Sequence, residues 1–268
     1  MKLKFSNLWH KSILVALSLT VLTGFSVSAV ADEGLLAKIK QRGSLKVGLE
    51  GTYPPFSFQD ENGHLTGFET EFARQLAQHL GVKAVIQPTK WDGMLAALDS
   101  KRLDVVINQV TVSPERQKKY DLSTPYTVSG IQALTLKDKA DSIKTPKDLS
   151  GKKVGVGLGT NYEQWLRANV QGVDIRTYDD DPTKYQDLRV HRLDAILVDR
   201  LAALDLVKKT GNILAVAGKP FSRLEAAVAI RKGNEDLVNA INQAITAMQK
   251  DGTMKKLSET WFGQDVSK

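Results

Sequence analysis

The sequence predicts an α/β fold of two similar lobes, each built around a mainly parallel sheet that helices cover. Short apolar strands alternate with amphipathic helices through residues 45–108, and the alternation restarts at residue 153. Such alternation is typical of parallel sheets with helices on both faces. A short internal echo supports two lobes, because RLDVVI at residues 102–107 resembles RLDAIL at residues 192–197.

Residues 1–31 are expected to be a secretory signal peptide. Three lysines precede an apolar run from Ser12 to Val30, and an A-x-A pattern at its end predicts cleavage after Ala31. An uncleaved membrane anchor is the alternative, since the run is nearly long enough to span a bilayer. The chain contains no cysteine, which excludes a lipid-anchored form, a disulfide framework and a thiolate metal site.

Composition argues against nucleic acid as a partner. Loss of the signal peptide removes three lysines and no acid, so the formal net charge falls from +7 to +4. Basic and acidic residues are interspersed, and they form no stripe of basic and aromatic residues. The histidines lack partners at metal-ligand spacing, and the run of acids at residues 179–181 is more typical of a helix cap than of a cation site. We therefore expect no metal and no cofactor.

The first lobe is expected to alternate three strands with two helices. Phe68, Phe72, Leu76 and Leu80 recur every four residues, as on the buried face of a helix. The prolines within residues 50–58 predict a stiff, extended loop that presents Tyr53. Asp92 is a plausible N-cap for the next helix. The strands are expected at residues 45–49, 83–87 and from residue 104.

An unusual helix start follows the third strand. Ser113 suits the N-cap, Pro114 the first helical position and Glu115 the positive end of the helix dipole. Arg116 is a misfit there, because a cation in the first turn adds to the positive pole at a cost of up to about 1 kcal/mol. A bound anion would explain it, since free N–H groups and a guanidinium would then converge on one carboxylate. A salt bridge within the protein is the alternative.

The second lobe is expected within residues 128–224, and the first lobe combines residues 32–127 with residues 225–268. Extended runs at residues 127–136 and 225–230 would join the lobes, and two crossings make a hinge. A long helix from Asn234 to Lys250 and a short helix ending at Trp261 would return to the first lobe. In the second lobe, strands are expected at residues 153–156, 174–177 and 195–198, with helices at residues 162–168 and 182–188.

A ligand site is expected where the carboxyl ends of the strands meet. Arg116 and the Thr111 hydroxyl suit an α-carboxylate, and Asp199 suits an α-ammonium. Tyr53 and Trp91 offer flat apolar walls. These groups together are complementary to a zwitterion.

Each of these residues also has a simpler interpretation. Asp199 could cap the helix that begins at Leu201, and Tyr53 and Trp91 could belong to the core. Glu50 could be a solvated loop acid or a second partner for an ammonium. The stretch GVGLGTN lacks the spacing of both nucleotide-binding glycine motifs, so its glycines either expose backbone N–H groups to the ligand or simply make the turn.

Five long stretches resemble the periplasmic polar amino-acid-binding proteins of ABC importers, solute-binding protein family 3, and within them the L-cystine binders of enteric bacteria. The stretches are GLEGTYPPFSFQ, TKWDGMLAALDSKRLDVVINQVT, KKVGVGLGTNYEQWLR, RTYDDDPTKYQDLRV and DAILVDRLAALDLVKKT. The resemblance implies a two-lobed type II periplasmic-binding-protein fold. It also implies that Arg116 clamps the ligand carboxylate, that Asp199 takes the ammonium, and that Tyr53 and Trp91 sandwich the ligand. The other implied cleft residues are Glu50, Asn108, Gln109, Thr111, Gly159, Thr160 and Asn161.

The resemblance implies a monomeric periplasmic protein that closes on an L-amino acid and delivers it to an inner-membrane ABC permease. Glutamine binders of the family carry a lysine where Gly157 stands and a histidine where Val198 stands, so a roomier pocket is expected, compatible with L-cystine. An enzyme similar to the periplasmic cyclohexadienyl dehydratases, with Glu50 as the cleft acid, is the alternative. A third possibility is a ligand-presenting partner of a sensor or chemoreceptor.

Overall fold

The computed structural model describes residues 34–211 and 213–267. The expected signal peptide and its cleavage after Ala31 lie outside these residues. Within the described part of the chain, every helix is too short or too polar to cross a membrane.

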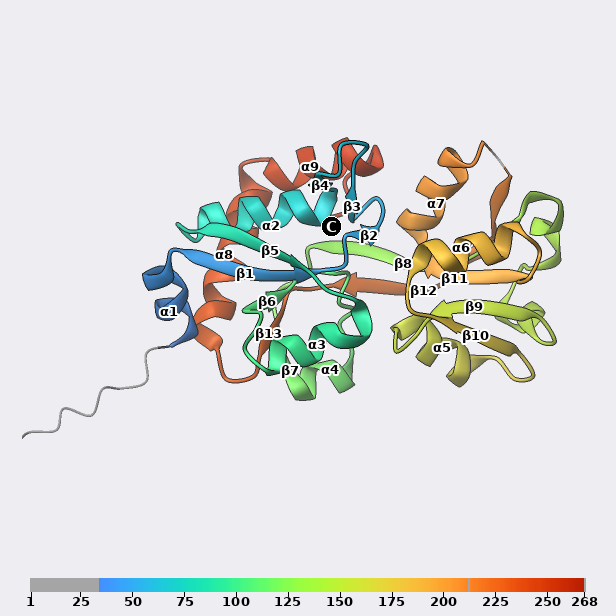
Figure 1. Cartoon of the computed structure of the whole chain (residues 1–268), viewed down its shortest axis with the longest axis horizontal. Helices are drawn as coiled ribbons and strands as arrows, with labels where there is room; N and C mark the ends of the chain where they lie inside the picture. Colours follow the sequence, from blue (N-terminus) through green and yellow to red (C-terminus); the bar gives the residue numbers. More distant parts are fainter. Residues whose placement is uncertain (1–33, 212, 268) are drawn as a thin grey trace, which may run out of the picture. The chain divides into compact units, whose positions relative to one another are not determined.

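Two five-stranded sheets form the framework of the structure (Figure 1). The first has the order β5 (Lys83–Pro88), β1 (Ser44–Leu49), β6 (Val105–Val106), β13 (Ala229–Arg231) and β7 (Tyr120–Leu122). The second has the order β10 (Asp174–Tyr178), β9 (Lys153–Gly157), β11 (Ala195–Asp199), β8 (Thr127–Leu136) and β12 (Leu214–Ala226). We call the parts of the protein built on these sheets the first and the second lobe.

Each sheet is mixed, although the sequence predicts mainly parallel sheets. In both lobes the three predicted strands are parallel neighbours, and two further strands join them through antiparallel pairing. The added strands come mostly from the two extended runs that were expected to join the lobes. The run at residues 225–230 is in fact the end of β12 and the start of β13.

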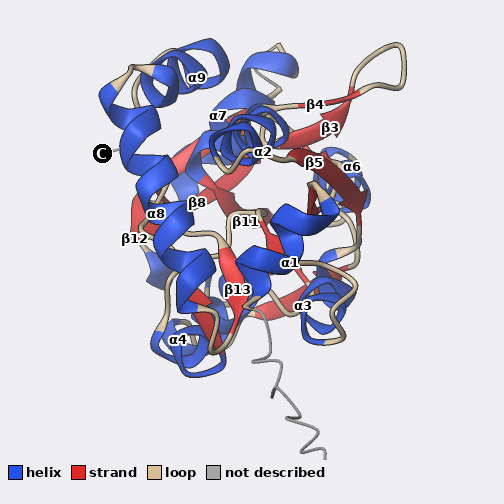
Figure 2. Ribbon diagram, turned by 90° about the vertical axis from the view of Figure 1, so that its left-hand side faces the viewer, coloured by secondary structure: helices blue, strands red, loops and turns tan. Residues whose placement is uncertain are grey.

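Helices cover both faces of each sheet (Figures 1 and 2). In the first lobe, α1 (Leu35–Arg42), α2 (Phe68–His79), α8 (Glu235–Lys250) and α9 (Thr253–Phe262) lie on one side, and α3 (Trp91–Asp99) and α4 (Pro114–Lys119) on the other. In the second lobe, α6 (Asp181–Arg189) and α7 (Arg200–Lys209) lie opposite α5 (Asn161–Asn169). Two 3-10 turns, Lys137–Ser142 and Pro146–Leu149, complete the second lobe.

The predicted apolar faces form the core. Phe68, Phe72 and Leu76 are fully buried along α2, as their spacing predicts. The ring of Phe72 stacks on that of Tyr126, with centroids 4.6 Å apart. This aromatic packing fixes the chain where it leaves the first lobe for β8.

Two local predictions are wrong. Asp92 is not an N-cap, because α3 already begins at Trp91 and Lys90 precedes it. The stretch with two prolines is not extended throughout, since β2 (Thr52–Tyr53) turns back to pair with β3 (Ser57–Gln59), and β4 (Leu65–Thr66) completes a small sheet. This turn buries Tyr53 and brings β2 against α6 of the second lobe.

Two long strands run between the lobes. β8 and β12 pair antiparallel from Thr127 and Ala226 outward, with a register shift between Ala217 and Ser222. Figure 1 shows both strands passing from one lobe to the other. The helices α8 and α9 return to pack on α2 of the first lobe. The domain boundaries 32–127 with 225–268, and 128–224, remain our prediction.

Candidate functional site

The carboxyl ends of the parallel strands meet between the two lobes. In the first lobe, Glu50 follows β1, Trp91 lies just beyond β5 and Asn108 follows β6. In the second lobe, Leu158 follows β9 and Asp179 follows β10. Ligands of open parallel sheets bind at such ends.

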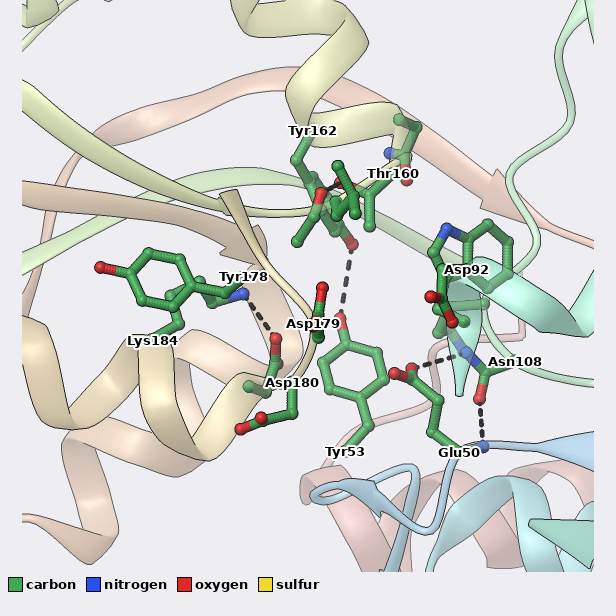
Figure 3. A pocket seen from close by; sticks show the side chains of 16 residues that line it. Glu50, Tyr53, Asp92, Asn108, Thr160, Tyr162, Tyr178, Asp179, Asp180 and Lys184 are labelled. Atoms are coloured by element: carbon green, nitrogen blue, oxygen red, sulfur yellow. Dashed lines mark hydrogen bonds and ion pairs between the residues drawn. The ribbon is translucent and has the colours of Figure 1, made fainter. Parts of the chain in front are cut away.

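A small pocket, about 50 Å³ in volume, lies at this meeting point (Figure 3). It is lined by both lobes, and seven of the predicted site residues belong to its wall. These are Glu50, Tyr53, Trp91, Asn108, Gln109, Thr160 and Asn161. Thr111, Arg116, Gly159 and Asp199 are not among the residues that line it.

Arg116 lies in the first lobe, where the sequence predicts an anion site. Its backbone N–H donates to the Ser113 hydroxyl, so Ser113 is the predicted N-cap. Its guanidinium donates to the carbonyl of Thr111 at 3.0 Å and lies 5.2 Å from the centroid of the Trp91 ring. Among the described residues no acid forms a salt bridge with it, which disfavours the internal ion pair. Burial lowers the pKa of Arg116, but a guanidinium stays charged in proteins.

Asp199 ends β11 and is 1% exposed. One carboxylate oxygen accepts from the Ser129 hydroxyl and from the N–H of Leu201, both at 2.7 Å, so Asp199 does cap α7. Burial raises the pKa of Asp199 to about 6, against the lowering effect of these hydrogen bonds. Burial makes the ionised form of this carboxylate costly, and a bound cation would stabilise it.

Two tyrosines of the pocket wall meet between the lobes. The Tyr53 hydroxyl lies 3.4 Å from the Tyr162 hydroxyl, one on each lobe. Both are nearly buried, and burial raises both pKa values well above the usual one, with the charge of Asp199 adding to the effect. Tyr162 also feels the opposite charge of Arg116. Tyr162 therefore feels charges of opposite sign, Asp199 from its own lobe and Arg116 from the other.

A second contact crosses the cleft. The indole N–H of Trp91 donates to the carbonyl of Gly159 at 3.2 Å. Gly159 has φ of 69°, a conformation that favours glycine, and its N–H donates to Glu163 at 2.7 Å. Thr160 caps α5 through its hydroxyl, which also donates to the carbonyl of Gly157 at 2.7 Å. The loop after β9 thus holds a fixed shape at the first turn of α5.

Glu50 and Asn108 form a pair in the first lobe. The Asn108 amide donates to the Glu50 carboxylate at 2.8 Å and accepts from the Glu50 backbone N–H at 2.8 Å (Figure 3). Burial raises the pKa of Glu50 to about 7, and the acids of the second lobe add to the effect. Glu50 is therefore a pocket acid held in place, and not a solvated loop residue.

Gln109 links the pocket wall to buried residues of the protein. Its backbone has φ of 46°, and its N–H donates to the buried Glu69 at 2.7 Å. The Gln109 side chain also donates to Glu69 and accepts from Thr127 at the start of β8. The backbone N–H of Gln109 is thus bonded inside the protein, and Gln109 lines the pocket with its other atoms.

Several lining residues were not singled out as ligand-binding residues from the sequence. They are Asp92, Tyr162, Tyr178, Asp179, Asp180, Asp181 and Lys184. Asp180 caps α6 by accepting from Thr183, as the acidic run predicts. The rule used for the other strands would have found Tyr178 and Asp179, because Tyr178 ends β10 and Asp179 follows it directly. The described residues contain no group of three or more acids or histidines placed to hold a metal ion.

Comparison with known proteins identifies the family. The model of the bacterial extracellular solute-binding proteins, family 3, matches residues 45–264. The chain belongs to this family. It is 69% identical over 266 residues to the L-cystine-binding protein TcyJ of Escherichia coli (strain K12), covering 99% of this chain and 100% of the relative.

Solved structures agree with the fold. An ancestral arginine-binding protein bound to arginine is 43% identical, with a TM-score of 0.79 over 83% of this chain and 99% of the other. The ancestral amino acid-binding protein AncCDT-1, described as a precursor of cyclohexadienyl dehydratase, is 39% identical, with a TM-score of 0.80 over 86% and 100%. These relatives are binding proteins, and the chain is likewise a binding protein and not an enzyme. The dehydratase alternative is therefore not retained.

Proposed function

We propose that this protein captures an L-amino acid, L-cystine in preference to others, between its lobes and delivers it to an inner-membrane ABC permease. It would act as a monomer in the periplasm after removal of residues 1–31. The relative that is 69% identical is named an L-cystine-binding protein, and this supports the choice of ligand.

One observation carries the proposal. Arg116, a guanidinium without an acidic partner among the described residues, belongs to the first lobe, and Asp199, a carboxylate that is 1% exposed, belongs to the second. An α-carboxylate would bind Arg116 and Thr111, and an α-ammonium would bind Asp199. Tyr53 and Tyr162 would move apart to admit the ligand, and the remaining predicted residues would surround it.

Closure follows from the placement of these charges. A ligand that touches both lobes binds the closed state more tightly than the open one, so it shifts the population toward closure. The contacts Trp91–Gly159 and Tyr53–Tyr162 already join the lobes in this structure. The closed form would then be the one that the permease recognises.

Thermal unfolding and calorimetry of the chain from residue 32 test the ligand. L-Cystine should raise the melting temperature and saturate one site per molecule, because a ligand at 100 times its Kd stabilises the folded state by about 2.7 kcal/mol. A panel of the other L-amino acids gives the comparison. Tighter binding of another amino acid, with no shift by L-cystine, would overturn the choice of L-cystine.

A further inference from the structure

The pocket wall contains more charged side chains than are needed to bind one α-amino-acid group. Besides Glu50, its wall contains Asp92, the acidic run at residues 179–181 and one cation, Lys184. In Figure 3, Lys184, Tyr178 and Asp180 lie on one side of Tyr53, and Glu50 and Asn108 lie on the other. Arg116 and Asp199 are absent from this wall, so the charged groups here form a separate set.

Lys184 is a buried cation with few partners. It lies on α6, is only 1% exposed, and is one of the largest fully buried side chains of the protein. Its ammonium lies 2.5 Å from an oxygen of Asp181 and 5.3 Å from the centroid of the Tyr185 ring. An ammonium has three N–H donors, and among the described residues its one hydrogen bond is to Asp181. The Tyr185 hydroxyl donates to the other oxygen of Asp181, so Asp181 is shared.

The opposite lobe contributes a carboxylate to the same pocket. Glu50 on the first lobe lines it together with Asp180, Asp181 and Lys184 on the second lobe. The two lobes therefore place a cation and acids around one space. A group with both charges would satisfy them, whereas a single cation would leave Lys184 facing like charge.

A further donor in the same wall lacks an acceptor. The Asn161 side-chain nitrogen is buried and has no hydrogen-bond partner among the described residues. Buried polar atoms without partners are rare and costly in native proteins. A ligand oxygen in the pocket would supply the acceptor.

We propose that the part of the pocket between Glu50 and Lys184 binds a second α-amino-acid group at the far end of the ligand. Its carboxylate would accept from Lys184, and its ammonium would lie between Glu50 and Asp180. The ligand class is an amino acid with two zwitterionic ends, and Lys184 is then a residue that selects for it. This inference rests on the proposed function, since it assumes that the first end is held by Arg116 and Asp199.

Changing ligand and protein together tests the contact. Calorimetry would compare L-cystine, the mixed disulfide of L-cysteine and cysteamine, which lacks only the far carboxylate, and S-methyl-L-cysteine, which lacks the whole far group. The variants are Lys184→Met, Lys184→Arg and, as a control on an exposed lysine of α7, Lys208→Met. Such a cycle isolates the pairwise interaction from the effects of either change alone.

The wild-type protein should bind L-cystine at least tenfold more tightly than the mixed disulfide. Lys184→Met should abolish most of this preference while leaving affinity for S-methyl-L-cysteine within threefold, and Lys184→Arg should restore part of it. Equal wild-type affinities for L-cystine and the mixed disulfide would overturn the inference, even if Lys184→Met does not fold. A variant that weakens all three ligands equally would also overturn it.

Failure of the proposed function has a different signature. In that case the wild-type protein would bind neither L-cystine nor S-methyl-L-cysteine. If only the proposed site between Glu50 and Lys184 is wrong, the protein binds both ligands, and removing the far carboxylate does not change the affinity.

Discussion

At the scale of single residues, Arg116 is the most informative side chain. Its place in the first turn of α4 is unfavourable without an anion, and none of the described acids forms a salt bridge with it. The sequence predicts this residue because its charge opposes the local dipole. Burial and the missing partner could be learned only from the structure.

Replacement of Arg116 by alanine should weaken amino-acid binding by about 2 kcal/mol or more, the cost of removing a buried charged hydrogen-bond partner. Calorimetry measures the affinity, and Arg102→Ala, at an exposed site away from the pocket, is the control. Unchanged affinity in Arg116→Ala would remove this residue from the site.

Asp199 has two roles that one variant can separate. Asparagine also caps helices well, so Asp199→Asn should keep the melting temperature of the ligand-free protein within a few degrees. It should nevertheless lose at least tenfold in affinity, because the ammonium loses its negative partner. A variant with lower stability and normal affinity would leave Asp199 as a cap alone.

The raised pKa of Asp199 gives this residue a pH signature. A bound ammonium favours the ionised carboxylate, so binding should release protons near pH 6 and weaken as the pH falls below about 6. Calorimetry in buffers of different ionisation enthalpy counts the protons. Asp199→Asn should reduce the release. The same release in the variant would assign it to another group.

Other residues of the site escaped prediction for a physical reason. Lys184 lies in α6, whose sequence is typical of a polar surface helix. The burial of Lys184 depends on the packing of α6 against β9 and against the first lobe. The N–H of Gln109 pairs with Glu69, forty residues earlier in the chain. Neither contact leaves a local pattern in the sequence.

At the scale of elements, a buried network joins α2, β8 and the loop after β6. Glu69 accepts from Gln109 and from the Tyr126 hydroxyl, and Gln109 accepts from Thr127. Glu69 is fully buried, which raises its pKa to about 7 from 4.5. This network sets the shape of the chain at the floor of the pocket and at the start of a strand between the lobes.

Glu69→Gln should change the pH dependence of stability. An acid with a raised pKa binds a proton more tightly when folded, so its contribution to stability falls as the pH rises from 4.5 to 7. Glutamine removes this loss, worth at most about 3 kcal/mol, and keeps an acceptor for the N–H of Gln109. Urea unfolding at pH 5 and pH 7.5 measures the difference, with exposed Glu61→Gln as control. Parallel pH curves for the variant and the wild type would contradict the prediction.

Two glycines near the cleft should respond in opposite ways to alanine. Gly159 has φ of 69°, so Gly159→Ala should destabilise by about 1 kcal/mol although its Cβ would meet nothing within 4 Å. Gly93 lies inside α3 with similar open space, so Gly93→Ala should stabilise by about 0.5–1 kcal/mol. Chemical unfolding measures both, and changes of the same sign would be evidence against this account.

The order of elements was largely predictable, and the sheet partners were less so. Alternation of strands and helices gave the parallel strands of both lobes at nearly the observed bounds. It missed α1, the 3-10 turns and the small sheet of β2, β3 and β4, because these elements are short and lack a periodic pattern. The antiparallel strands β8 and β12 were recognised as extended, but their pairing is a long-range property.

At the scale of the whole molecule, function depends on the balance between open and closed lobes. The Trp91–Gly159 hydrogen bond is one of the contacts that join them. Two lobes were predictable from the repeated α/β pattern and the family resemblance. The contacts between the lobes were not predictable, because they are formed by residues far apart in the sequence.

Trp91→Phe should shift the ligand-free protein toward the open form, because it keeps an aromatic ring and loses one hydrogen bond worth about 1 kcal/mol. Since the chain has no cysteine, spin labels at Gln78→Cys and Arg189→Cys report the distance between lobes cleanly. Trp165→Phe, which stacks on Phe221 within the second lobe, is the control. An unchanged distance distribution in Trp91→Phe would contradict a role in closure.

A crystal structure of the protein with L-cystine tests the central claim most directly. We expect one ligand carboxylate within hydrogen-bond distance of Arg116, about 2.7–3.2 Å, and the neighbouring ammonium at the same distance from Asp199. A ligand bound between the lobes with both of its amino-acid groups away from Arg116 and Asp199 would contradict the account.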